Sequence, residues 1–150
     1  MPKEPIDRFT EVHWFLSNFY PCRVKFEGLT YPSSEHAYQA AKCLHARDRR
    51  LIAKCPTAGE AKRIGRRVEA IKDWDKRRLA IMHRVVMAKF KQNKKLGRKL
   101  IETYPAKLEE GNNWGDRVWG TVDGVGKNWL GFVLMDVRKK LMGVTTSVCV

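Results

Sequence analysis

The stretch Tyr31-Pro32-Ser33-Ser34-Glu35-His36-Ala37-Tyr38-Gln39-Ala40-Ala41-Lys42 decides the fold of the N-terminal half of the chain. Its proline ends an extended segment, and either serine can cap the helix that follows, whose positive end favours a carboxylate. Glu35 and Lys42 are seven residues apart, so both project from one helix face roughly 10 Å apart along the axis. Tyr38 and Gln39 lie between them on that face. An acid, an aromatic ring, an amide and an amine in one row are unusual for a core stripe and indicate a functional site.

The residues before this stretch predict a small antiparallel sheet. Residues 23–26 alternate like a half-buried strand, Glu27-Gly28 is a hairpin turn signal, and residues 29–31 return antiparallel. The hairpin therefore leads directly into the predicted helix.

The residues after it are mainly helical. Thr57 and Glu60 form a capping-box pattern for a helix that Gly65 ends. Further elements are predicted from caps and periodicity: a long helix capped by Asp73 with Leu79, Met82, Val86 and Phe90 on its apolar face, a helix from Asn93 that ends before Pro105, a short strand at 118–122, and a last helix capped by Asn128. The fold class is α+β: a mainly helical single domain, residues 1–150, with a small N-terminal antiparallel sheet.

The composition is that of an ordinary globular protein, with 43% hydrophobic and 31% charged residues. No apolar run approaches the ~18 residues that span a bilayer, and the first residues lack a signal-peptide core. We therefore expect a cytoplasmic protein without a membrane partner. Its four cysteines, Cys22, Cys43, Cys55 and Cys149, form no C-x-x-C pair and are expected to be reduced thiols.

The net charge of +14 favours phosphorylated partners such as nucleotides or nucleic acid. The alternative is that the basic residues only solvate helix faces. The charge alone does not distinguish one phosphate from another.

Glu35 and Lys42 each have an ordinary explanation beside the functional one. A carboxylate at a helix start is often only a favourable dipole partner, and a lysine is usually solvated. Taken as a pair, a lysine in a partly dry pocket can act as a nucleophile toward an aldehyde-like carbon. A carboxylate two turns away can shuttle a proton to a departing group.

A second cluster surrounds Asp116 on a glycine-rich loop that also carries Trp114 and Trp119. Its tryptophans can stack on a flat base while the carboxylate accepts hydrogen bonds from hydroxyls. The alternative is a core tryptophan beside a capping aspartate. Trp74 lies near a helix start, where packing is the default interpretation.

Other chemical templates are missing. There is no glycine-rich phosphate loop followed by Lys-Ser/Thr, no serine nucleophile elbow, and no histidine spacing that suits a metal. We therefore expect neither a metal nor a cofactor.

Taken together, these motifs resemble those of the YbiA-like family, also called NADAR domains. The resemblance covers about residues 12–142 and rests on motifs in a fixed order: Phe15–Phe19, Ser34–Lys42, Ala58–Gly65, Asp73-Trp74, Met82, Ala88–Asn93, Glu110, Asp116, Trp119-Gly120, Gly126, Asn128, Leu130-Gly131, Leu134-Met135 and Val137-Arg138. The chain departs from the family pattern in its tail, Val144–Val150, and in its basic excess.

The resemblance implies an N-glycosidase, a hydrolase that cleaves the ribose C1′–N bond of phosphoribosylamino-pyrimidine intermediates of riboflavin synthesis. Other family members remove ADP-ribose from guanine bases, so ADP-ribosylated DNA or RNA is an alternative partner to a small nucleotide-like molecule. A non-catalytic nucleotide- or nucleic-acid-binding module is a second alternative.

The resemblance also implies roles for individual residues. Glu35 would be the acid/base group and Lys42 the Schiff-base nucleophile, with Lys89 as a rival amine or a substrate-binding residue. The other substrate-binding residues would be Asn18, Trp74, Asp116 and Trp119.

Overall fold

A computed structural model describes residues 3–143, and these group into two compact units. One unit spans Asn18–Asn93. The other combines the residues up to Ser17 with those from Lys94 onward. Each unit is described by itself, and the single-domain organisation stays a prediction.

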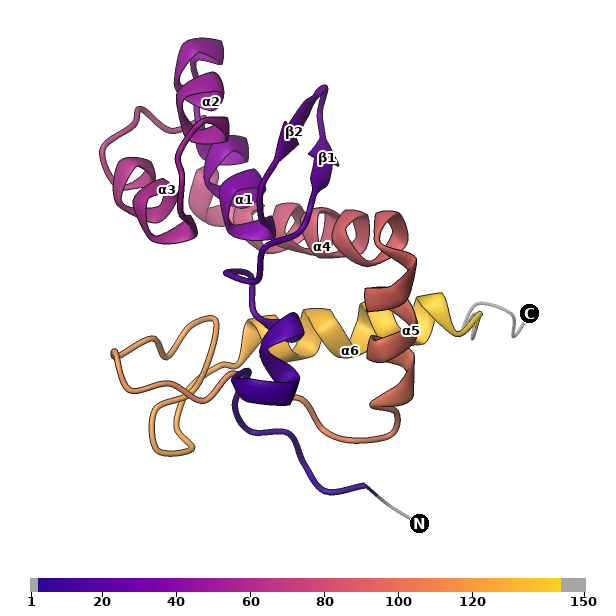
Figure 1. Cartoon of the computed structure of the whole chain (residues 1–150). Coiled ribbons are helices and arrows are strands. Elements are labelled where there is room, and N and C mark those ends of the chain that lie inside the picture. The colour runs from indigo at the N-terminus through magenta and orange to yellow at the C-terminus, as the bar shows by residue number, and fades with distance from the viewer. Residues whose placement is uncertain (1–2, 144–150) are drawn as a thin grey trace, which may run out of the picture. The chain divides into compact units, whose positions relative to one another are not determined.

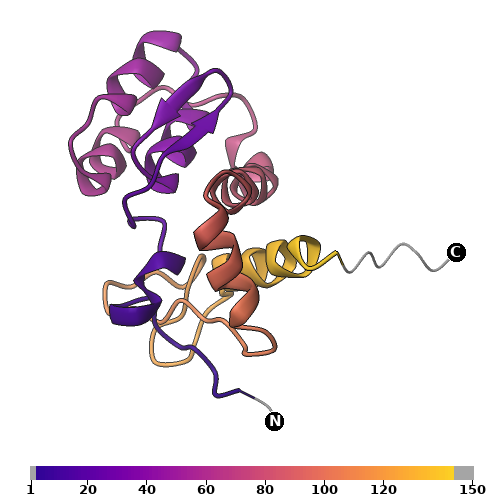
Figure 2. The ribbon, with the colours of Figure 1, turned by 45° about the vertical axis from the view of Figure 1, so that its right-hand side comes forward.

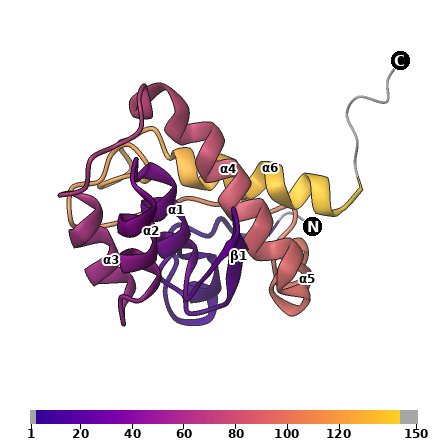
Figure 3. The same ribbon diagram turned by 90° about the horizontal axis from the view of Figure 1, so that it is seen from above.

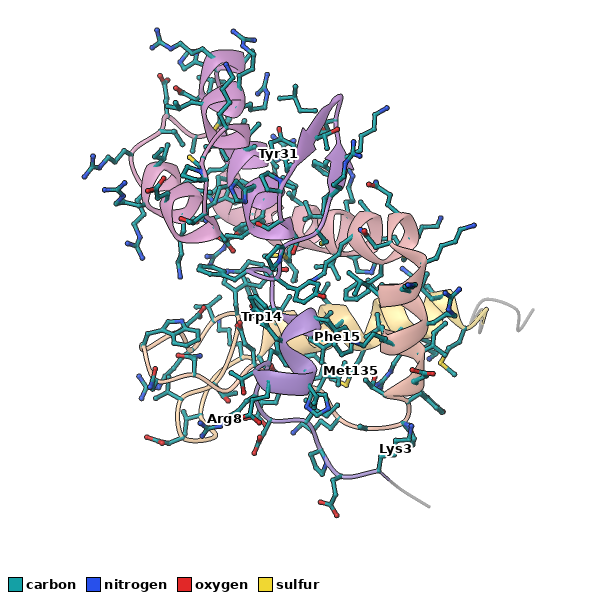
Figure 4. The ribbon with its side chains drawn as sticks, in the orientation of Figure 1. Lys3, Arg8, Trp14, Phe15, Tyr31 and Met135 are labelled. Atoms are coloured by element: carbon teal, nitrogen blue, oxygen red, sulfur yellow. The ribbon has the colours of Figure 1, made fainter. Side chains whose placement is uncertain are left out.

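The predicted hairpin is confirmed in the Asn18–Asn93 unit. Strands β1 (Val24–Phe26) and β2 (Leu29–Tyr31) pair antiparallel, with Val24 opposite Tyr31. Positive φ angles of 47° at Glu27 and 88° at Gly28 make the tight turn that such a two-residue hairpin requires. Tyr31 is 2% exposed and lies between the hairpin and the helices (Figure 4).

Helix α1 (Ser34–Lys42) is the central element of this unit. It packs against both strands and against α2 (Ala46–Ala53), α3 (Ala58–Gly65) and α4 (Trp74–Gln92), as Figures 1 and 3 show. The predicted serine cap is confirmed, because the Ser33 hydroxyl accepts the backbone N–H of His36 at 3.1 Å. All residues from Ser34 to Ala40 are buried, so the polar side chains of α1 are enclosed by protein.

Helices α3 and α4 follow the predicted pattern with two corrections. Thr57 caps α3 by accepting the N–H of Glu60, and α3 ends at Gly65 as expected. Asp73 precedes α4 but makes no side-chain cap, because its φ of 58° places it in the left-handed region. Leu79 is 40% exposed and does not belong to the buried face that Met82, Val86 and Phe90 form. Helix α2 was not predicted.

The other unit contains the 3-10 helix η1 (Glu11–Leu16), α5 (Lys94–Glu102) and α6 (Trp129–Leu141). Helices α5 and α6 pack against each other (Figure 2), burying Leu100 and Leu134. In the unpredicted η1, Phe15 is buried whereas its neighbour Trp14 is 45% exposed (Figure 4). Helix α5 ends before Pro105, as predicted.

The predicted strand at 118–122 is wrong. This part of the chain forms only the isolated bridges Gly111–Thr121 and Val122–Val125, since its backbone turns too often to form a ladder. Asn128 directly precedes α6 but does not cap it. Its φ is 52°, and its amide instead accepts the N–H of Glu110 and donates to the Leu108 carbonyl.

The mainly helical fold with one small antiparallel sheet is confirmed for the described residues. Between residues 3 and 143, no helix is long and apolar enough to cross a membrane. In that range Cys22, Cys43 and Cys55 are free thiols, whereas Cys149 and the Val144–Val150 tail lie outside the described residues.

Candidate active site

Glu35 lies in the first turn of α1 and is held there by hydrogen bonds. Its residue is 7% exposed, and its backbone N–H donates to the Asn18 carbonyl at 3.0 Å. Its carboxylate accepts a 2.7 Å hydrogen bond from the Gln39 amide, one turn along the helix. A buried carboxylate with a fixed orientation is the arrangement that acid/base chemistry requires.

Asn18 fastens the segment before the hairpin to the start of α1. Its side-chain oxygen accepts the Ser34 hydroxyl at 2.9 Å, and its amide donates to the sulfur of Met82 on α4 at 3.4 Å. Because Asn18 is 6% exposed and its amide oxygen is engaged, it holds the Glu35 helix turn in place.

Gly65 gives Gln39 the room to reach Glu35. A Cβ at Gly65 would overlap the Gln39 amide oxygen and lie 2.6 Å from its Cδ. The Gly65 carbonyl accepts the Lys42 ammonium at 2.8 Å. Gln39 and Lys42 therefore both meet the end of α3, in agreement with the predicted row from Glu35 to Lys42.

Lys89 is the most deeply buried amine in the described residues. It lies on α4, is 0% exposed, and its Nζ is 4.9 Å from the Phe90 ring centroid and 5.8 Å from that of Tyr20. Burial lowers the pKa of Lys89 to about 8, against a smaller opposing effect of Cys22. Burial also raises the pKa of the Cys22 thiol.

The two candidate lysines therefore have different environments. Lys42 is only partly buried and bonded to a carbonyl, whereas Lys89 is enclosed by protein and rings. A neutral amine is the nucleophilic form, and a pKa near 8 leaves a useful fraction of Lys89 neutral at neutral pH.

His36 neighbours Glu35 but serves the fold. Its Nδ1 accepts the Ser33 hydroxyl at 2.7 Å, and its Nε2 donates to the Cys55 carbonyl at 2.9 Å. Burial lowers the pKa of His36, so the neutral ring ties α1 to the residues after α2.

Trp74 packs on α1. Its ring lies 5.2 Å from that of Tyr38 at an interplanar angle of 49°. Trp74 is partly exposed at the first position of α4, so one side packs while another can meet a ligand.

Asp116 and Trp119 belong to the other unit, where they shape a loop. The Asp116 Oδ1 accepts the backbone N–H groups of Val118 and Trp119 at 3.0 and 2.9 Å. The Trp119 ring meets Trp129 edge-on at 5.6 Å. Trp114 is 63% exposed.

These positions can be compared with known proteins. The model of the NADAR domain matches residues 7–142 of this chain. The chain belongs to the NADAR domain family. The recognition made from the motif order is thus confirmed.

Named relatives of this NADAR chain agree with the family. It is 39% identical over 134 residues to the riboflavin biosynthesis protein VVA0006 of Vibrio vulnificus, covering 87% of this chain but 36% of the relative. It is 38% identical over 129 residues to N-glycosidase YbiA of Escherichia coli, covering 84% of this chain and 80% of YbiA. The chain thus spans about a third of the first relative and most of the second. The predicted enzyme class, a hydrolase of N-glycosyl bonds, is confirmed by the YbiA name.

A solved structure shares the fold of this NADAR chain. The NMR structure of Escherichia coli YbiA superposes with a TM-score of 0.84 at 34% identity, covering 95% of this chain and 87% of YbiA. The arrangement of helices around the small hairpin is therefore that of YbiA.

Sequence reasoning missed the residues that support the site. The Gln39 hydrogen bond to Glu35 and the contact of Gly65 with Gln39 depend on how α3 meets α1. The one sequence signal was the four-residue spacing of Glu35 and Gln39. The burial of Lys89 beside Tyr20 had no sequence signal at all.

Proposed function

We propose that this NADAR chain hydrolyses the ribose C1′–N bond of a phosphoribosylated base, such as a phosphoribosylamino-pyrimidine intermediate of riboflavin synthesis. The names of its relatives, an N-glycosidase and a riboflavin biosynthesis protein, support this substrate class. The single observation that carries the mechanism is the buried Glu35 carboxylate, oriented by Gln39 at 2.7 Å.

Glu35 acts as the acid/base group. As the C1′–N bond breaks, its electron pair goes to the departing nitrogen, which needs a proton. A carboxyl group held by one amide and enclosed by protein can deliver that proton, and the resulting carboxylate can then activate a hydroxyl or a water. Such a group typically contributes about 10²–10⁴-fold to a rate.

An amine captures C1′ in the covalent version of this mechanism. The lone pair of a neutral lysine forms the new bond to C1′ as the base leaves, and the sugar then opens to a protonated Schiff base. Water adds to that carbon and releases the sugar with regeneration of the amine. Lys42 lies in the predicted row with Glu35, but the burial and lowered pKa of Lys89 favour Lys89 as the amine.

Four residues complete the proposed site. Asp116 offers its second carboxylate oxygen to ribose hydroxyls, and Trp119 and Trp74 offer partly exposed rings to the base. Asn18 contributes by holding the turn that carries Glu35.

The test combines product detection with trapping. Purified protein is incubated with a phosphoribosylamino-pyrimidine, and mass spectrometry measures the released base. Base release by wild type and its loss in Glu35→Gln are expected, whereas no release from this substrate would contradict the proposal. Borohydride trapping of a protein–sugar adduct in wild type, absent in Lys89→Met but present in Lys42→Met, is expected if Lys89 is the amine.

A second candidate substrate is ADP-ribosylated guanine in nucleic acid, which the net charge of +14 favours. Phosphate contacts supply most sequence-independent affinity for nucleic acid and weaken steeply with salt. Turnover of an ADP-ribosylated oligonucleotide that falls steeply with salt would favour this substrate. Salt-insensitive turnover of the small substrate would favour the first.

A further inference from the structure

Phe19 is a large apolar side chain that the fold leaves 40% exposed. It follows Asn18 directly, and the carbonyl of Asn18 accepts the backbone N–H of Glu35 at 3.0 Å. The position of the Phe19 backbone is therefore fixed relative to the proposed acid. A ring exposed at such a place lacks a core-packing explanation for its exposed part.

Lys62 reaches the same place from α3. Its ammonium lies over the Phe19 ring, 5.9 Å from the centroid. Lys62 and Gly65 are three residues apart, so they share one face of α3, and Gly65 on that face contacts Gln39. The lysine thus lies one turn away from the residue against which the partner of Glu35 rests.

The Lys62–Phe19 pair borders the Glu35–Gln39 pair on two sides. One link runs through the backbone from Phe19 to Asn18 and Glu35, and the other runs along α3 from Lys62 to Gly65 and Gln39. No acidic side chain is paired with Lys62 among the ion pairs of the described residues, which leaves its charge available for an anion.

We propose that Lys62 binds the phosphate of the phosphoribosyl substrate and that Phe19 is the positioning residue that holds the ammonium there. This rests on the proposed function and deepens it, because it names the group of the substrate that the site recognises beside the acid. A lysine ammonium offers a compact charge with three donors to a phosphate. A ring face attracts the ammonium and limits its range.

The experiment measures binding of ribose 5-phosphate and of ribose to the full chain by NMR titration, so that it requires no turnover. Wild type is expected to bind ribose 5-phosphate more tightly than ribose. Lys62→Gln should bind ribose 5-phosphate roughly tenfold more weakly, as expected for the loss of one charged hydrogen bond, with ribose binding unchanged. Phe19→Leu should lose severalfold in ribose 5-phosphate affinity, and Phe19→Tyr should restore it.

Lys25→Gln is the matched control, since it removes the same charge from an exposed strand position of the same unit. It should bind both sugars as wild type does. Equal loss of ribose 5-phosphate affinity in Lys25→Gln and Lys62→Gln would overturn the proposal, as would undiminished affinity in Lys62→Gln. In turnover assays, KM should rise in Lys62→Gln for the phosphorylated substrate only. A wild type that binds the sugar phosphate through Lys62 but releases no base would overturn the proposed function and leave the phosphate site standing.

Discussion

Two regions of this molecule use polar side chains in opposite ways. Along α1, Glu35 and Gln39 are buried and hydrogen-bonded to each other, side chain to side chain. In the loop at 112–119, Asn112 and Asp116 are partly exposed and bind backbone groups of their own loop, such as the N–H of Trp119.

The difference separates chemistry from loop shape. Burying a carboxylate is costly unless it is hydrogen-bonded, and a pair such as Glu35–Gln39 satisfies that need without neutralising the acid. An aspartate that accepts backbone N–H groups mainly stabilises a turn, as capping residues do. Substitutions in α1 should therefore affect the rate, and substitutions in the loop should mainly affect binding and stability.

The largest expected effect is that of Glu35→Gln. The amide keeps the size and the acceptor for Gln39 but cannot give up a proton, so kcat should fall about 10²–10⁴-fold. Base release under single-turnover conditions measures this, with thermal unfolding as the control for folding. A variant that retains a tenth of wild-type kcat would move the acid role away from Glu35.

Lys89→Met should affect rate and stability in opposite directions. Burial disfavours the charged form in the fold, so below pH 8 the charged Lys89 reduces the free energy of unfolding. Methionine removes that cost, and we expect a gain on the order of 1–3 kcal/mol at pH 7 together with at least a hundredfold loss of kcat.

The pH dependence gives the sign of the same effect. Because the pKa of Lys89 is about 8 in the fold and 10.5 ordinarily, the folded state releases this proton first. Wild-type stability should gain a contribution as pH rises from about 8 to 10.5, and kcat/KM should rise through pH 8. Denaturant unfolding and initial rates measure both. If the rate limb stays in Lys89→Met and vanishes in Lys42→Met, Lys42 is the amine.

Gly65→Ala tests the support of Glu35 without touching it. The added methyl would overlap the Gln39 amide, which must then leave Glu35. We expect kcat to fall roughly tenfold, as for the loss of one charged hydrogen bond, with KM little changed. Gly59→Ala in the same helix is the matched control, because its Cβ would meet only a 3.9 Å contact with Thr57. Equal kcat in both variants would contradict the proposed role of Gln39.

Asp116→Asn should have a smaller effect on the loop side of the comparison. Asparagine keeps an oxygen for the N–H groups of Val118 and Trp119 but loses the charge that ribose hydroxyls would meet. We expect KM to rise severalfold with kcat unchanged. Asp116→Ala should also reduce the free energy of unfolding by about 1 kcal/mol, the usual cost of losing such a cap. A large fall of kcat in Asp116→Asn would place this carboxylate in the chemistry and end the distinction drawn above.

The sequence predicted features that depend on local chemistry. The Glu27-Gly28 turn, the Ser33 cap and the end of α3 at Gly65 all follow from residues adjacent in the chain, and all are confirmed. The wrong strand at 118–122 had a strand-like composition, but no neighbouring segment was available to form a ladder.

Features that depend on tertiary contacts were beyond sequence patterns. Leu79 has helix periodicity but ends exposed, since no element covers it. Asp73 and Asn128 occupy cap positions with left-handed φ, where Asn128 binds distant backbone instead. The proposed site divides in the same way: the Glu35 row was visible in the spacing, whereas the burial of Lys89 required the fold.

The smallest expected effect concerns His36, which tests whether buried polar groups of α1 can also be purely structural. Burial lowers the pKa of His36 below its ordinary 6.5, so the unfolded chain takes up this proton more readily than the fold. Its contribution to stability is therefore complete above pH 6.5 and is lost as the pH falls. Protonation would also convert Nδ1 into a donor and break its bond from Ser33. In urea unfolding between pH 7.5 and 5, His36→Gln should be less stable at pH 7.5 but should lose less stability with acid than wild type does. His45→Gln, at an exposed histidine paired with Glu69, is the control and should keep the wild-type loss with acid. Should wild type and His36→Gln have parallel pH profiles, the neutral ring would not be what links α1 to Cys55, and the polar cluster of α1 would be functional throughout.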